Sequence, residues 1–173
     1  MRPSIARLAV SLGLTGVTRN TLAGLTIEVE GRPSGVAAFQ QRLASSLPTG
    51  AVTDGVEVAA IAPRQHSTFV IGQDDANGPL TTQVPRDTRV CDECLAEIRN
   101  RDDRRYLYPL TTCATCGPRF SLLRNMPFER DHTTLDMFPL CDECRTEYTS
   151  PADRRFHAQT IACSKCGPRV WLA

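Results

Sequence analysis

The sequence lacks the features that would place it in a membrane or on nucleic acid. Its 173 residues hold no apolar run approaching the ~18 residues that a membrane-spanning helix needs. Its 20 basic and 19 acidic side chains nearly balance, and they form no block of like charge. We therefore expect neither a membrane nor a nucleic acid as a partner.

A secretion signal is not expected either. Arg7, Ser11 and Gly13 interrupt the apolar stretch over residues 1–14, and no small-residue cleavage site follows it. The stretch is typical of an amphipathic helix in a cytoplasmic protein. In such a reducing compartment, closely paired cysteines are more often metal ligands than disulfides.

Cysteine is absent from the first 90 residues, and all eight cysteines lie from Cys91 onward. The stretch from Gln73 to Pro79 has the composition of a turn and linker. We therefore expect a first domain at residues 1–73, a linker at 74–90 and a second domain at 91–173. Aromatic residues make up only 6% of the chain, and small cores of this kind often depend on bound metal.

The first domain alternates helical and strand patterns. Apolar residues at helical spacing predict one helix that ends near Gly13 and another that begins at Ser34 as its N-cap. Strands are predicted at 17–20, 25–30, 56–60 and 69–71. This order is that of an α+β, ferredoxin-like sandwich without its first strand. Because that strand is central, we expect a vacancy between strands 25–30 and 56–60. Apolar helix residues should then be under-covered, namely Ile5, Leu8, Phe39 and Leu43.

The cysteines follow an internal duplication. Two C-x2-C-x18-C-x2-C units, at 91–119 and 141–169, repeat with a period of 50 residues and share thirteen identities over 29 positions. The matches include the four cysteines, Glu97 and Glu147, an Asp-Arg-Arg segment after each helix-like stretch, and a Gly-Pro-Arg end.

This spacing predicts two structural zinc ions. Two cysteines two residues apart present both sulfurs from one turn, and two such turns complete a tetrahedral site without an open position. We expect one ion on Cys91, Cys94, Cys113 and Cys116, and one on Cys141, Cys144, Cys163 and Cys166. A crossed sharing of the pairs stays open, as do a redox dithiol, an iron–sulfur cluster and disulfides.

Other residues of the duplication have expected structural roles. Gly117 and Gly167 should adopt positive φ behind the second cysteine pair. Asp103 and Asp153 should pair locally with the neighbouring arginines, and the alternative is that the Asp-Arg-Arg segments form an interaction surface. His157 should be packed rather than a ligand. Residues 86–173 hold 14 basic and 13 acidic side chains, so with two metal sites this half is at about −3. That charge argues against a nucleic-acid-binding zinc ribbon.

The doubled cysteine pattern resembles the HypF family, the carbamoyltransferases of nickel–iron hydrogenase maturation. So do the strings Cys113–Phe120 (CATCGPRF), Asp153–Gln159 (DRRFHAQ) and Cys163–Pro168 (CSKCGP). The resemblance implies an N-terminal acylphosphatase-like domain followed by two zinc fingers. It also implies carbamoyl phosphate and ATP as substrates, and the C-terminal cysteine of a HypE-type partner as the acceptor. Adenylation and transfer belong to later domains of that family, so the chain is expected to be a fragment.

The same resemblance implies two catalytic residues in the first domain. Arg2 resembles the cation at the end of the acylphosphatase phosphate loop, and Asn20 resembles the amide that positions the attacking water. The rest of that loop, which supplies backbone N–H donors to phosphate, is missing because Met1 directly precedes Arg2. We therefore expect the chain by itself to be catalytically incomplete. The alternatives are a non-catalytic zinc scaffold that binds a protein, and a small acylphosphatase with a zinc appendage.

Overall fold

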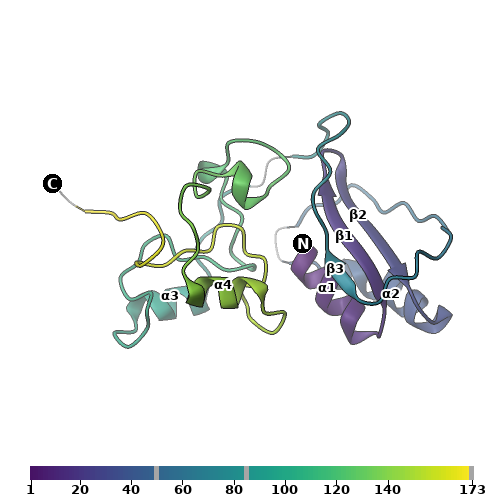
Figure 1. Cartoon of the computed structure of the whole chain (residues 1–173), viewed down its shortest axis with the longest axis horizontal. Coiled ribbons are helices and arrows are strands. Elements are labelled where there is room, and N and C mark those ends of the chain that lie inside the picture. Colours follow the sequence, from purple (N-terminus) through teal and green to yellow (C-terminus); the bar gives the residue numbers. More distant parts are fainter. Residues whose placement is uncertain (49–50, 84–85, 172–173) are drawn as a thin grey trace. The chain divides into compact units, whose positions relative to one another are not determined.

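The computed structural model describes residues 1–48, 51–83 and 86–171 (Figure 1). The chain divides into two compact units, Met1–Leu80 and Thr81–Ala173. Residues 84–85 of the expected linker and 172–173 of the expected second domain lie outside the described residues. No described helix is both long and apolar enough to cross a membrane.

The first unit is a small sheet with two helices. Helix α1 (Arg2–Ser11) leads into β1 (Thr15–Thr21) and β2 (Gly24–Glu30), and α2 (Pro33–Ser46) precedes the short β3 (Phe69–Ile71). The sheet order is β2-β1-β3, with β1 antiparallel to β2 and parallel to β3. Helix α2 begins at Pro33, whose missing N–H costs nothing at a first helical position, rather than after Ser34.

The helices pack their apolar faces onto one side of this sheet. Ile5 and Ala9 are fully buried, and Leu8, Leu14 and Phe39 are nearly so. Partly buried residues of both helices and of β2 and β3 surround this cluster. The expectation that Ile5, Leu8 and Phe39 would be under-covered is therefore wrong, because side chains from the two helices and the sheet pack closely over them.

The expected strand at 56–60 is also absent. The described residues between α2 and β3 form no regular element up to Thr68, and residues 52–60 are all exposed. Val56 and Val58 are 62% and 67% exposed. Alternation of valines is not sufficient for a strand, which also needs a neighbour to complete its ladder. Within the described residues, β2 is an edge strand.

The second unit has little regular structure. Helices α3 (Asp92–Arg99) and α4 (Asp142–Thr149) occupy equivalent places in the two repeats. Two 3-10 turns, η1 (Phe120–Leu122) and η2 (Arg130–His132), lie in the spacer between them. Asp87 accepts a hydrogen bond from the backbone N–H of Ser121 in η1. The buried clusters of this unit centre on cysteines rather than on large apolar side chains.

Candidate metal centres and a buried ion pair

Each cysteine group is built from one helix start and one loop. Cys91 and Cys141 are the N-cap residues of α3 and α4, so Cys94 and Cys144 point inward from the first turn. Asp and Glu follow each N-cap, which favours a helix start because acidic groups complement the positive end of the helix dipole. Both inner cysteines are fully buried.

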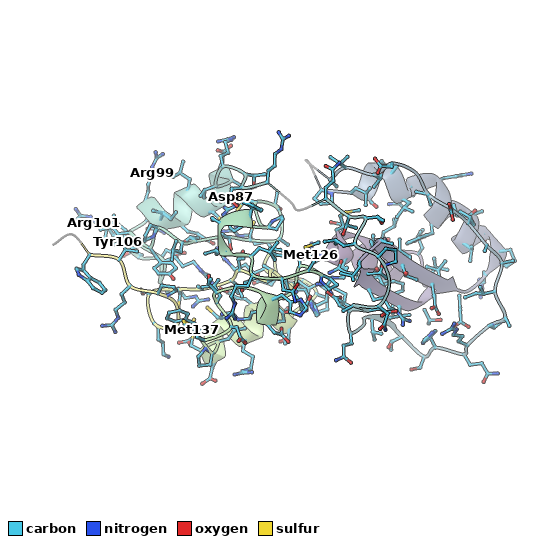
Figure 2. The ribbon with its side chains drawn as sticks, turned by 90° about the horizontal axis from the view of Figure 1, so that it is seen from above. Asp87, Arg99, Arg101, Tyr106, Met126 and Met137 are labelled. Atoms are coloured by element: carbon cyan, nitrogen blue, oxygen red, sulfur yellow. The ribbon has the colours of Figure 1, made fainter. Side chains whose placement is uncertain are left out.

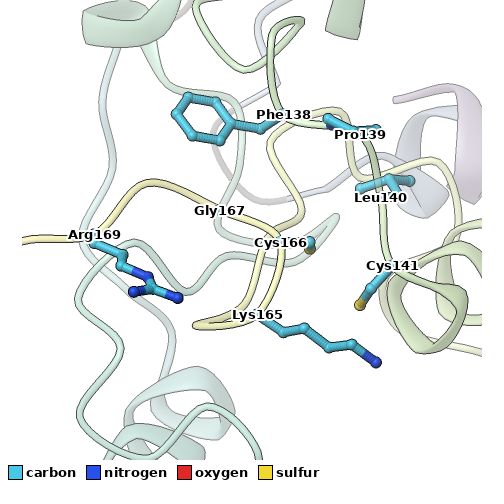
Figure 3. A pocket seen from close by; sticks show the side chains of 8 residues that line it. All are labelled: Phe138, Pro139, Leu140, Cys141, Lys165, Cys166, Gly167 and Arg169. Carbon is cyan, nitrogen blue, oxygen red and sulfur yellow. The ribbon is translucent and has the colours of Figure 1, made fainter.

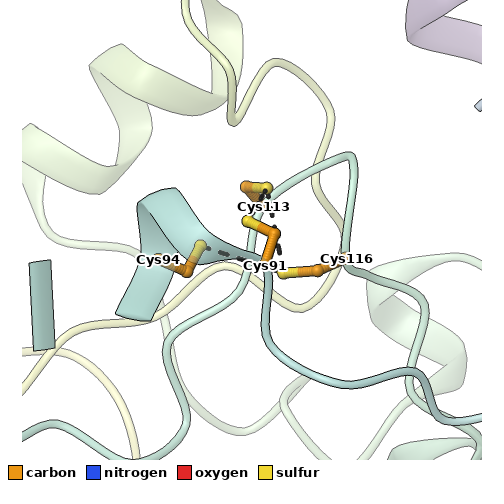
Figure 4. A group of neighbouring side chains, drawn as sticks. All are labelled: Cys91, Cys94, Cys113 and Cys116. Carbon is orange, nitrogen blue, oxygen red and sulfur yellow. Dashed lines mark hydrogen bonds between the residues drawn. The ribbon is translucent and has the colours of Figure 1, made fainter. Parts of the chain in front are cut away.

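The first group has the dimensions of a tetrahedral thiolate site. The sulfur of Cys113 lies 3.6 Å from that of Cys91 and 3.8 Å from that of Cys116, and Cys116 lies 3.8 Å from Cys94 (Figure 4). A regular tetrahedron with Zn–S bonds of about 2.3 Å has edges of about 3.8 Å. The four sulfurs are thus placed at the corners that a zinc ion requires.

The second group repeats this geometry. The sulfur of Cys163 lies 3.8 Å from that of Cys141 and 3.7 Å from that of Cys166, and Cys166 lies 3.6 Å from Cys144. Within each group all four ligand atoms lie within 4.8 Å of one another, and each group draws on a single repeat. This grouping opposes the crossed arrangement. None of the eight cysteines forms a disulfide. The two four-cysteine groups are compatible with two structural zinc ions.

The glycines behind the second cysteine pairs have a different role from the expected one. Neither Gly117 nor Gly167 adopts positive φ. Each donates its N–H to the carbonyl of the cysteine four residues earlier, at 2.8 Å. A Cβ on Gly167 would lie 2.0 Å from the hydroxyl of Tyr108 and 2.7 Å from the Cβ of Ala162. Close packing therefore favours glycine here, rather than backbone conformation.

The arginine pairs of the duplication reach across to the opposite repeat. Arg104 and Arg105 contact Glu147 at 2.6 and 2.5 Å. The equivalent Arg154 and Arg155 form ion pairs with Glu97. Burial opposes ionisation of Glu147, but its guanidinium partners outweigh burial and lower its pKa to about 2. The same opposing causes lower the pKa of Glu97.

The local contacts of Asp103 and Asp153 with the arginines that follow them involve the arginine backbone. Asp103 and Asp153 each accept the backbone N–H of the second arginine at 2.7 Å, which closes a tight turn. The turn then directs the guanidiniums toward the other repeat. By contrast, Arg99 and Arg101 are exposed and point outward (Figure 2). The match between the repeats identified these arginines and glutamates as equivalent residues. It did not predict that the arginines of one repeat contact the glutamate of the other.

His157 is a packed residue within the second repeat. Its ring lies 4.9 Å from the ring of Tyr148 and 4.7 Å from that of Phe156. It belongs to neither cysteine group among the described residues. It has a φ of 50°, and Leu107, at the equivalent position of the first repeat, has a φ of 56°. The duplication therefore preserves a backbone turn whose side chain differs.

The spacer is tied to the second repeat by one buried arginine. Arg130 donates to the carbonyls of Gln159, Ile161 and Phe138 at distances from 2.8 to 3.0 Å. Burial lowers its pKa. These bonds hold Phe138, near the end of the spacer, and residues 159–161 of the second repeat against η2.

A shallow hollow of about 530 Å³ lies beside Cys141 and Cys166 of the second cysteine group (Figure 3). Phe138, Lys165 and Arg169 are among its lining residues, beside Cys141 and Cys166. Lys165 is exposed and contacts Glu143 at 3.3 Å. The hollow leaves Cys141 and Cys166 half-buried, whereas Cys144 and Cys163 are buried.

In the first unit, the two expected catalytic residues meet at a third residue. The guanidinium of Arg2 lies 2.5 Å from the carboxylate of Asp74, and both side chains are under 10% exposed. The backbone N–H and side-chain amide of Asn20 donate to the same carboxylate at 3.1 and 2.9 Å. The sequence places Asp74 in the expected linker because its neighbours have turn composition. The only sequence feature that could have indicated a role for Asp74 is its acidic side chain within that linker.

Each of the two units matches a known protein family. The HypF finger family matches residues 90–123 and 140–173, and the acylphosphatase family matches residues 1–71. A carbamoyltransferase HypF from Rhodobacter capsulatus is 45% identical over 140 residues, which is 80% of this chain. The corresponding protein from Synechocystis is 36% identical over 137 residues, or 79% of this chain.

Solved structures give the same result. A full-length HypF in its phosphate- and nucleotide-bound form superposes with a TM-score of 0.90 at 38% identity and covers 97% of this chain. That of T. kodakarensis HypF gives 0.82 at 37% identity over 96% of the chain. The chain spans 18% of each of the two curated relatives and 22% and 21% of the two solved chains. It belongs to the HypF carbamoyltransferase family, of which it carries the acylphosphatase-like domain and the zinc fingers.

Proposed function

We propose that the chain is the N-terminal portion of a cytoplasmic HypF-type carbamoyltransferase. In this proposal the whole enzyme uses carbamoyl phosphate and ATP to carbamoylate the C-terminal cysteine of a HypE-type partner. The observation that carries it is the joint occurrence, in one chain, of an acylphosphatase-like unit and two HypF fingers. The high TM-score to a full-length HypF supports the same assignment.

The first unit has two of the donor groups that an acyl phosphate site requires, the guanidinium of Arg2 and the amide of Asn20. The guanidinium of Arg2 and the two N–H donors of Asn20 converge on one carboxylate, that of Asp74. A phosphoryl group presents similar anionic oxygens, which charged and amide donors stabilise. In the proposed site Arg2 binds the phosphoryl oxygens and Asn20 holds the attacking water.

The zinc fingers have a structural role in this proposal. Four sulfurs fill each coordination shell, so no position is left for a substrate or water. The ions, when bound, supply folding free energy to a unit with little apolar core.

A chimaera tests the proposal. This chain replaces the matching segment of the Rhodobacter capsulatus relative, and mass spectrometry measures ATP-dependent carbamoylation of a HypE-type peptide. We expect an active chimaera, in which Arg2→Ala and Asn20→Ala each lower carbamoyl phosphate turnover about a hundredfold. Arg42→Ala, an exposed change on α2, is the matched control. A folded, zinc-loaded chimaera without carbamoylation contradicts the proposal and favours a non-catalytic scaffold.

A further inference from the structure

The two cysteine groups share an unusual set of neighbours. Among the sulfur contacts of the described residues, each group receives guanidinium groups from the other repeat and none from its own. These contacts involve sulfur atoms directly, in addition to the glutamates described above. They occur in both directions, as expected from an internal duplication.

The distances are those of N–H to sulfur hydrogen bonds. At the first group, Arg154 Nη1 lies 3.1 Å from the sulfur of Cys94 and 3.8 Å from that of Cys91. Arg155 Nη2 lies 3.8 Å from the sulfur of Cys94. The inner cysteine of the first group therefore accepts two guanidiniums of the second repeat.

The second group is contacted in the same way. Arg104 donates to the sulfur of Cys144 from Nη1 and Nη2, at 3.4 and 3.3 Å. Arg105 Nη2 lies 3.6 Å from the same sulfur. Both inner cysteines are fully buried, so water does not compete for these donors.

The second arginine of each pair, Arg105 or Arg155, is held in place by a buried hydrogen bond to a backbone carbonyl. Arg105 donates from Nε to the carbonyl of Ala162 at 3.1 Å, and Arg155 donates to that of Thr112 at 3.0 Å. These two arginines are 1% and 2% exposed. Each carbonyl directly precedes the third cysteine of the opposite group. Arg105 and Arg155 thus each contact two parts of the opposite cysteine group. One contact is with the sulfur of the cysteine on the helix, and the other is with the loop that carries the second cysteine pair.

The charges explain why such donors matter. A zinc ion with four thiolates has a formal charge of about −2, which is costly in a buried site unless nearby cations offset it. Two guanidiniums offset that charge, and the glutamate beside them holds both in place. Partners outside the ligand shell of this kind affect metal affinity by about 10- to 100-fold when they are changed.

We propose that the arginine pair of each finger is a positioning element for the metal site of the other finger, so that the two zinc ions bind cooperatively. Arg104 and Arg105 support the Cys141 group, and Arg154 and Arg155 support the Cys91 group. Loss of either metal loosens the repeat that carries the donors, and this weakens the remaining site. The inference does not depend on carbamoyl transfer.

Cadmium-113 NMR of the full chain tests the crossed assignment. Couplings from cadmium to the cysteine Hβ protons assign one resonance to each group. Arg154→Ala is expected to shift the resonance of the Cys91 group and to speed cadmium release to a chelator about 10- to 100-fold at that site first. Arg104→Ala should do the same at the Cys141 group. Arg124→Ala, a half-exposed arginine of the spacer paired with Asp136, should change neither resonance.

Lysine variants keep the test decisive if an alanine variant does not fold. Arg154→Lys and Arg104→Lys retain the positive charge, and each should shift only the resonance of the opposite group, by less than alanine does. A shift in the variant's own group, equal shifts at both groups, or no shift overturns the proposal. Zinc titration of the metal-free chain should fill both sites together, and stepwise filling also contradicts it.

Discussion

At the scale of single residues, the main stabilising contacts are buried charges with fixed partners. Arg2, Arg105 and Arg155 are each at most 5% exposed and each faces a carboxylate. Removal of one partner from such a pair is costly because the other charge keeps its desolvation penalty. The acidic residues that face these arginines are therefore expected to be sensitive positions.

Asp74 is the residue to test in the first unit. Asp74→Ala removes the carboxylate that faces Arg2 and Asn20, and we expect it to lower the free energy of unfolding of that unit by about 3 kcal/mol. Urea unfolding followed by NMR signals from residues 1–80 measures this. Asp54→Ala, an exposed change in the irregular segment, is the control and should change stability by less than about 0.5 kcal/mol. Equal effects of the two changes would show that the buried ion pair adds nothing.

Sequence reasoning found the ligand residues but not their surroundings. The doubled spacing identified all eight cysteines, because ligand spacing within one turn is a local property. Asp74, by contrast, lies 54 residues from Asn20 and 72 from Arg2. No periodic pattern links such positions, so only the folded chain shows that they meet. The crossing of the arginines was missed for the same reason.

At the scale of elements, a helix or strand pattern in the sequence formed the predicted element where a neighbouring element packs or pairs with it. The helix patterns at residues 2–11 and 33–46 formed because both could pack on the sheet. The valine alternation at 56–60 formed no strand, as no described strand lies beside it. Propensity thus predicted the elements that have a packing or pairing partner among the described residues. These include β3, which pairs with β1 although the two strands are far apart in sequence. It failed for residues 56–60, which have no such partner.

Amide hydrogen exchange tests this arrangement of elements. We expect slow exchange in β1, which has a strand on each side, and fast exchange over residues 52–60, which are exposed. Within β2, amides that face β1 should be slower than those on the outer edge. Slow exchange over 52–60 in a proven monomer would instead indicate a strand that the structure does not contain.

At the scale of the whole molecule, the two units draw on different sources of stability. The first unit buries an apolar cluster between two helices and a sheet. The second has two short helices, and its buried clusters are built around the cysteines. Metal ligation in such modules is folding free energy, so the two units should respond differently to chelators.

Metal content and chelation test this account most directly. Elemental analysis should give two zinc ions per chain. A strong chelator should unfold the second unit, so that the amide chemical shifts of residues 86–171 move to random-coil values. The chemical shifts of residues 1–80 should not change. Cys94→Ser or Cys144→Ser should likewise unfold the second unit and leave the first unit folded. One zinc ion per chain, iron in its place, or a second unit that stays folded without metal would contradict the account.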